Sequence, residues 1–141
     1  MTRTLATVLL VAVSLLGVSS CSSHKKATPP PQPVDERGAR QVSIIAAGSQ
    51  FTPPDVIVSP GTTVTWRNQD VQAHNVKKAA DALDFGGDFG VDAPQFGPGA
   101  SYSFTFRKVG TFPYTCTIHT LMNGTVRVEA GVPSTAPSTA P

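Results

Sequence analysis

The sequence predicts an all-β protein, a sandwich or a barrel, and three observations lead to that fold class. The chain of 141 residues contains 13 prolines and 12 glycines, which disfavour long helices. Thr, Val and Phe recur in short runs, which favours strands. Several runs alternate apolar and polar residues, with turn residues about every ten positions, as is typical of an antiparallel sandwich or barrel.

The predicted strands lie within residues 41–130, a length sufficient for one core. Residues 55–68 are expected to form two strands separated by a turn at Pro60-Gly61, because Val64 and Trp66 alternate with polar neighbours. The aromatic side chains of 100–106 fall on one face of a further strand. The remaining strands are expected at 41–47, 110–116 and 124–130.

The segment 77–98 breaks the alternation and predicts either a short helix or a long loop. Its four aspartates do not follow the spacing of an EF-hand loop. Two interpretations remain open, a solvated acidic loop and a surface that docks a partner or attracts cations. The aspartates are Asp81, Asp84, Asp88 and Asp92.

Residues 1–20 predict an export signal. Arg3 precedes an apolar run from Leu5 to Val18, which is shorter than the roughly 20 residues of a transmembrane helix. The following "VSSC" resembles the bacterial lipoprotein cleavage box, in which Cys21 becomes the lipidated N-terminus. An ordinary signal peptide with an incidental cysteine is the alternative. The lipid would hold the protein outside the cytoplasm, on the cell membrane.

The two ends of the mature chain read as polar extensions. Residues 21–40 are rich in proline and are expected to form a semi-extended tether, in which His24 is interpreted as an exposed linker histidine. Residues 131–141 repeat Pro-Ser-Thr-Ala and are expected to be disordered. The charge balance excludes a nucleic-acid footprint, because 14% of residues are charged and the formal net charge is +2.

The predicted domain contains a small set of metal-ligating side chains: one cysteine, Cys116, one methionine, Met122, and two histidines, His74 and His119. Blue copper sites combine two imidazoles and a thiolate in a plane with a weak axial thioether. Cys116 ends a predicted strand, and His119 and Met122 follow it at three-residue intervals. His74 follows another strand, so strand ends and their loops can bring all four inward. The inventory therefore predicts one type 1 copper ion.

Other chemistries fit these residues less well. Structural zinc sites favour cysteine and histidine, and methionine is a poor ligand for zinc. A nucleophilic Cys-His pair would need an orienting group and an oxyanion donor, and the sequence offers neither in recognisable form. We therefore do not expect an enzyme. A buried structural thiol at Cys116 is a further alternative.

Two segments together resemble the cupredoxins, and in particular the plastocyanin and amicyanin branch. They are "FTPPDVIVSPGTTVTWRNQDVQAHNV" and "GTFPYTCTIHTLMNGTVRVE". The Cys-x-x-His-x-x-Met spacing is the short-loop version of amicyanin-like members. The resemblance implies a Greek-key β-sandwich in which His74, Cys116, His119 and Met122 bind copper.

The same resemblance implies roles for neighbouring residues. Asn75 is expected to hold the ligand loops together with Thr117. His119 should be the ligand nearest the surface. Ile118 and Leu121 flank it and form either an apolar patch for a redox protein or part of the core.

Taken together, the sequence predicts a monomeric, membrane-tethered, extracytoplasmic carrier of single electrons. Its donor and acceptor would be other redox proteins. A copper-handling lipoprotein with the same ligands is the first alternative. An adhesion module without metal is the second.

Overall fold

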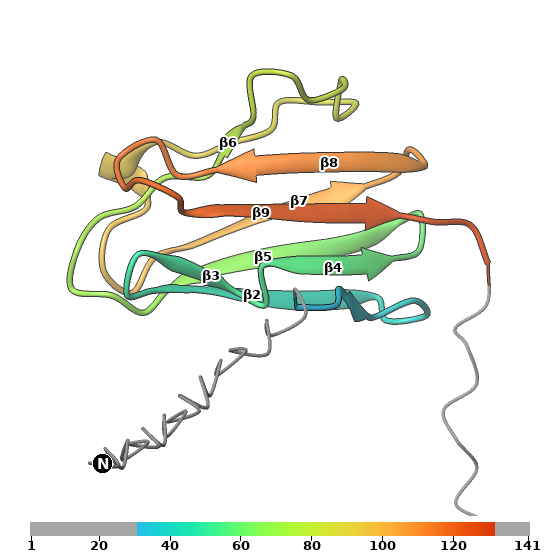
Figure 1. Ribbon diagram of the computed structural model, residues 1–141, viewed down its shortest axis with the longest axis horizontal. Coiled ribbons are helices and arrows are strands. Elements are labelled where there is room, and N and C mark those ends of the chain that lie inside the picture. The colour runs from blue at the N-terminus through green and yellow to red at the C-terminus, as the bar shows by residue number, and fades with distance from the viewer. Residues whose placement is uncertain (1–30, 132–141) are drawn as a thin grey trace, which may run out of the picture. The chain divides into compact units, whose positions relative to one another are not determined.

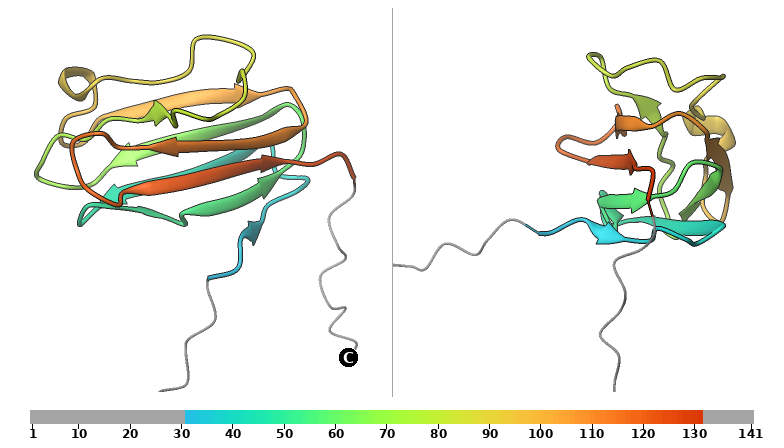
Figure 2. Two further views of the ribbon diagram at one scale, coloured as in Figure 1. Left: turned by 45° about the horizontal axis from the view of Figure 1, so that its top comes forward. Right: turned by 90° about the vertical axis from the view of Figure 1, so that its right-hand side faces the viewer.

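The computed structural model describes residues 31–131, which form two β-sheets packed face to face (Figure 1 and Figure 2). The strands are β1 (Val34–Asp35), β2 (Gln41–Ala47), β3 (Gln50–Thr52), β4 (Asp55–Val58), β5 (Thr62–Asn68), β6 (Lys77–Lys78), β7 (Ser101–Phe106), β8 (Gly110–Thr115) and β9 (Asn123–Val128). One 3-10 turn, η1, spans Ala93–Gln95. Within 31–131 no helix is long and apolar enough to cross a membrane. The predicted export signal, Cys21, His24 and residues 132–141 lie outside the described part.

The expectation of an all-β sandwich is confirmed, but the expectation of purely antiparallel sheets is wrong. One sheet has the order β1-β4-β9-β8-β6 and the other β3-β2-β5-β7. β2 pairs with β5, β4 with β9 and β1 with β4 in parallel. Among the described strands only β2–β3 and β8–β9 are consecutive strands of the same sheet, so most neighbours in a sheet are not neighbours in sequence. Alternation of apolar and polar residues shows which face of a strand is buried, but it does not distinguish parallel from antiparallel pairing.

The core forms where the inner faces of the two sheets meet. β5 turns Thr62, Val64, Trp66 and Asn68 inward, and every second residue between them is more exposed. Trp66 is fully buried, and its ring lies 5.1 Å from that of Tyr114 on β8. Large aromatic side chains bury much apolar area and therefore dominate the stability of a core this small.

The segment 77–98 begins with the two-residue strand β6 and continues as a long loop with a 3-10 turn, so the loop alternative is correct and the short helix is not formed. In Figure 1 this loop leaves β6 and rises above β8 before it reaches η1. Phe85 is 3% exposed, and its ring lies 4.2 Å from that of Phe89 and 5.0 Å from that of Phe112. The acidic side of the loop faces solvent, but its aromatic residues complete the core, so the segment is more than a solvated acidic loop.

The sheet begins inside the stretch that the sequence assigned to the tether. β1 pairs with β4 from Val34 onward, and Arg37 forms ion pairs with Asp35 and with Glu129 near the end of the domain. A strand of two exposed residues carries no alternation, so nothing in the sequence marked it.

Candidate metal centre

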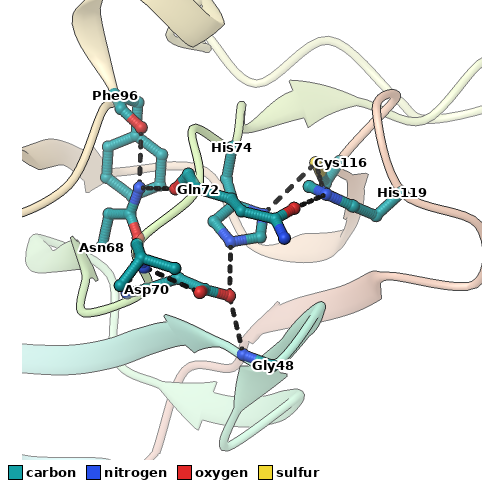
Figure 3. A network of polar contacts seen from close by, with 9 residues as sticks. Gly48, Asn68, Asp70, Gln72, His74, Phe96, Cys116 and His119 are labelled. Carbon is teal, nitrogen blue, oxygen red and sulfur yellow. Dashed lines mark hydrogen bonds and ion pairs between the residues drawn. The ribbon is translucent and has the colours of Figure 1, made fainter.

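Three of the four predicted ligands meet at the end of the sandwich where β5 and β8 stop. Cys116 follows β8 directly, His119 lies on the next loop, and His74 lies on the connection after β5. The Cys116 Sγ atom is 3.6 Å from Nδ1 of His119 and 3.9 Å from Nδ1 of His74. Figure 3 shows the His74 ring turned toward the sulfur, with its Nε2 pointing to Asp70, and His119 on the other side in contact with Gln72. One sulfur and two nitrogen donors therefore face a common centre.

The spacing of these atoms suits a metal ion. All three donor atoms lie within 4.8 Å of one another. Thiolate and imidazole ligands commonly lie about 2.3 and 2.0 Å from a metal, which in a trigonal plane separates sulfur from nitrogen by about 3.7 Å. The observed separations bracket that value. Two imidazoles and one thiolate are also the planar donors of blue copper.

Met122 closes the loop that begins at Cys116. The Cys116 amide donates a hydrogen bond of 2.9 Å to the Met122 carbonyl, and the Thr115 hydroxyl lies 3.3 Å from the same oxygen. Met122 is 1% exposed, so its thioether lies inside the protein at the same end of the sandwich. The two backbone ends of the ligand loop are thereby held together.

The site lies just below the surface, with one imidazole reaching outward. His74, Cys116 and Met122 are buried, whereas His119 is partly exposed. Two neighbours of His119 are clearly exposed, Ile118 at 49% and Leu121 at 88%. The interpretation of these two side chains as core packing is therefore wrong.

Comparison with known proteins decides the family. Residues 40–129 match the family described as copper binding proteins, plastocyanin/azurin family. The chain belongs to this family. It is 30% identical to amicyanin from Paracoccus denitrificans over 119 residues, which is 83% of this chain and 88% of that protein. The sequence-based assignment to the cupredoxins is thus confirmed.

Other cupredoxin relatives agree in sequence and in structure. Plastocyanin from Scenedesmus fuscus is 33% identical over 84 residues, covering 56% of this chain and 86% of that one. An oxidised amicyanin variant superposes with a TM-score of 0.54 at 32% identity, covering 72% of this chain and 95% of the variant. A copper-containing nitrite reductase from Thermus scotoductus gives 0.52 at 28% identity, but only 24% of that enzyme is covered.

The two loops of this cupredoxin that carry the ligands are joined by a pair of hydrogen bonds. The Asn75 side-chain amide donates to Thr117 Oγ1 over 2.8 Å, and the Thr117 backbone amide donates to Asn75 Oδ1 over 2.8 Å. Asn75 follows His74 and Thr117 follows Cys116, so the pair connects the residues next to two ligands. Contacts of this kind orient metal ligands and tune the metal.

Sequence reasoning missed two residues that contact the imidazoles from behind. Asp70 Oδ2 lies 3.2 Å from Nε2 of His74, and Gln72 Oε1 lies 3.1 Å from Nε2 of His119. The hydrogen bond with His74, and then the one from the Val71 amide, hold the pKa of the Asp70 carboxyl below its ordinary value. The signal in the sequence was an acidic residue four positions before a ligand histidine.

Asn68 fixes the connection that carries Asp70 and Gln72. Its buried side-chain amide donates to the carbonyls of Gln72, at 2.8 Å, and of Phe96, at 2.9 Å. Its Oδ1 accepts the Asp70 amide at 2.9 Å. A buried amide with three satisfied hydrogen bonds gives this connection one defined shape. His74, a predicted ligand, is held in the same way, because its own amide donates to the Phe96 carbonyl.

Proposed function

We propose that this cupredoxin carries single electrons through one type 1 copper ion held by His74, Cys116, His119 and Met122. The observation that carries the proposal is the approach of two Nδ1 atoms to the Cys116 sulfur, within 4 Å each, on loops that also bury Met122. When bound to such a set, copper supplies a one-electron Cu(I)/Cu(II) couple. The protein's own residues then determine how little the ligands rearrange and how close a partner can approach.

The surroundings of the ligands favour a site that changes little between oxidation states. Hydrogen bonds between Asn75 and Thr117 join the ligand loops. A backbone hydrogen bond from the Cys116 amide to the Met122 carbonyl closes the loop between these two residues. Imidazole suits both oxidation states of copper, and a weak axial thioether adds little bond energy. A set that is already in place has little to rearrange when an electron arrives, which favours rapid transfer.

The partly exposed His119 gives the shortest route from the site to the surface. Ile118 and Leu121 flank it, and Val71 on the neighbouring connection is 87% exposed. We define Val71, Ile118 and Leu121 as the apolar rim. Exposed apolar residues grouped at a functional site are typical of docking surfaces, and electron-transfer complexes are small in area and weak. The rim therefore fits brief contacts with a redox protein as donor or acceptor.

The rim can be tested without knowing the partner, by using the protein as its own partner. Electron self-exchange between Cu(I) and Cu(II) protein requires two molecules to approach through the exposed imidazole. Leu121→Asp should slow self-exchange, measured by NMR line broadening, because it places like charges in the contact. Val109→Asp is a suitable control, since Val109 is 62% exposed but lies on the turn between β7 and β8.

The copper proposal itself is tested by colour and by voltammetry. Protein loaded with Cu(II) should develop the intense blue absorption of a copper–thiolate bond, and Cys116→Ser should abolish it. A colourless wild-type protein, or a serine variant that keeps the band, would overturn the assignment. A reversible one-electron wave supports a carrier. Binding without a reversible wave would instead support the copper-handling alternative, which the similarity to amicyanin and plastocyanin does not favour.

The proposed place of action is the outer side of the cytoplasmic membrane. The motif at Val18 to Cys21 supports lipidation of Cys21, and the proline-rich stretch that follows supports a tether between lipid and domain. Cys21→Ser should release the protein from the membrane fraction in the producing cell. Label from a fatty acid analogue should appear in the wild type and be lost in the variant. A labelled, membrane-bound serine variant would exclude this anchor.

A further inference from the structure

We propose that Asp70 is a positioning residue of the copper site, which fixes the His74 ring through Nε2 and whose charge favours Cu(II) over Cu(I). The inference rests on the copper site proposed above. It concerns a residue outside the ligand set, and it assigns to that residue a part in setting the reduction potential.

The first argument is the position of the carboxylate. Asp70 Oδ2 lies 3.2 Å from Nε2 of His74, and the same oxygen accepts the Gly48 amide over 2.9 Å. Its Oδ1 accepts the Val71 amide over 2.7 Å. The carboxylate is therefore fixed on both oxygens, by the turn between β2 and β3 and by its own loop (Figure 3). Its side chain is only 18% exposed, and His74 is fully buried.

The second argument is what this contact does to the ring. A carboxylate is an acceptor, so the neutral imidazole donates its Nε2–H to Asp70. Nδ1 then carries the lone pair, and Nδ1 is the atom that faces Cys116 at 3.9 Å. A hydrogen bond from the far nitrogen to a carboxylate selects the tautomer and raises the basicity of a metal-bound imidazole.

The third argument is a contrast between the two imidazoles. His119 has the same kind of contact at Nε2, but its partner is the neutral amide oxygen of Gln72 at 3.1 Å. One connection thus supplies a charged partner to the buried ring and a neutral partner to the outer ring. A negative charge stabilises the more positive oxidation state of a nearby metal, and the effect is larger where water is excluded. The buried ring is where a carboxylate acts most strongly.

The experiment is the reduction potential of copper-loaded variants, measured together with their visible spectra. Asp70→Asn keeps the shape and an acceptor oxygen but removes the charge. We expect it to lower the ratio of Cu(II) to Cu(I) affinity about tenfold, which raises the potential by about 59 mV. The thiolate band should persist, and Asp70→Glu should restore a lower potential. Asp84→Asn is the matched control, because the Asp84 carboxylate also accepts hydrogen bonds from a glycine amide and a basic nitrogen but lies on the 77–98 loop. It should change the ratio of Cu(II) to Cu(I) affinity less than twofold.

A charge-relocation variant keeps the test decisive if Asp70→Asn binds copper poorly. Gln72→Glu places a carboxylate behind His119, so its reduction potential should be lower than that of the wild type. An unchanged potential in Asp70→Asn would overturn the tuning role, and where that variant binds too little copper, an unchanged potential in Gln72→Glu would do so. In metal-free protein, nitrogen NMR should show His74 with its proton on Nε2, and Asp70→Ala should mix the tautomers. A mixed tautomer in the wild type would overturn the positioning role, whereas a wild type without a blue band would refute the copper proposal alone.

Discussion

Two regions of the sandwich are held in place by different forces. The connections that carry the ligands, 69–76 and 116–122, are fixed by side-chain hydrogen bonds such as those between Asn75 and Thr117. The 77–98 segment is fixed mainly by aromatic rings, of which Phe85 and Phe96 are buried in the core. Hydrogen bonds have defined directions, whereas burial of apolar surface does not.

The difference matches what each region has to do. A ligand loop must aim individual nitrogen and sulfur atoms at one point, so directional contacts are required around it. The side chains of the 77–98 segment have only to cover the core, for which rings of suitable size suffice. The backbone carbonyl of Phe96 is the exception, because it accepts the Asn68 and His74 amides. Substitutions in the aromatic loop should therefore change stability and leave the copper spectrum unaltered. Substitutions around the ligands should change both.

The largest effect on stability is expected for Phe85→Ala. Phe85 is 3% exposed, and its ring lies within 6.3 Å of those of Phe89, Phe104, Phe106 and Phe112. Removing a buried phenylalanine ring costs about 3–5 kcal/mol of unfolding free energy. Chemical denaturation of the metal-free protein measures this loss. The reduction potential and visible spectrum of the folded, loaded variant should match those of the wild type.

A neighbouring position on the same loop provides the control. Leu83 is 63% exposed, so Leu83→Ala should change the unfolding free energy by no more than about 0.5 kcal/mol. If Phe85→Ala instead left stability intact and shifted the copper potential, the division of labour between the two regions would be wrong.

An intermediate effect is expected for Asn75→Ala, which removes both hydrogen bonds between the ligand loops. The Thr117 amide then loses its partner, and we expect a loss of about 1–3 kcal/mol in the metal-free protein. The loaded protein should show a shifted visible spectrum, because Thr117 follows Cys116. Denaturation and absorption spectra measure the two effects.

Thr117→Ala separates the two bonds of this pair. It removes the hydroxyl that accepts the Asn75 amide but keeps the Thr117 backbone amide and its bond to Asn75 Oδ1. We expect about half the destabilisation of Asn75→Ala. Equal stability of the wild type and Asn75→Ala would contradict a structural role for the pair.

These expectations also show which parts of the fold the sequence could predict. Alternation located every strand of six or seven residues, including β5 and β8. It failed for β1, β3 and β6, because strands of two or three residues are too short to show a period. Parallel pairing was missed for a different reason, since it depends on where the chain changes sheets and not on the residues of a strand.

The metal centre was accessible to sequence reasoning to a similar extent. The scarcity of sulfur and imidazole in the sequence identified His74, Cys116 and His119, and the structure brings their donor atoms together. Asp70 and Gln72 were missed because aspartate and glutamine are ordinary loop residues, and their contacts depend on the shape that Asn68 imposes. The anchoring rings of 77–98 follow no period, so the sequence left a short helix and a long loop open for this segment.

The smallest effect concerns Tyr114, which lies two residues before Cys116 but is held like the aromatic region. Burial raises the pKa of its phenol well above the ordinary value of 10.0. The neutral phenol is the form that the core accommodates, so the folded state keeps this proton after the unfolded chain has lost it. Stability should therefore fall as pH rises above about 10, by at most about 1.4 kcal/mol per pH unit.

Tyr114→Phe tests this account, because phenylalanine has no proton to lose. The hydroxyl reaches the Pro54 carbonyl only at 3.5 Å, so its removal should cost at most about 1 kcal/mol near neutral pH. The alkaline loss of stability, measured by denaturation at a series of pH values, should become shallower in the variant. Tyr102→Phe should have the smaller effect, since Tyr102 is only partly buried, although burial raises its pKa too. If the alkaline slope were unchanged in Tyr114→Phe, this ring would not be the group that links folding to alkaline pH. Burial would then be an incomplete account of how the strand leading into the ligand loop is held.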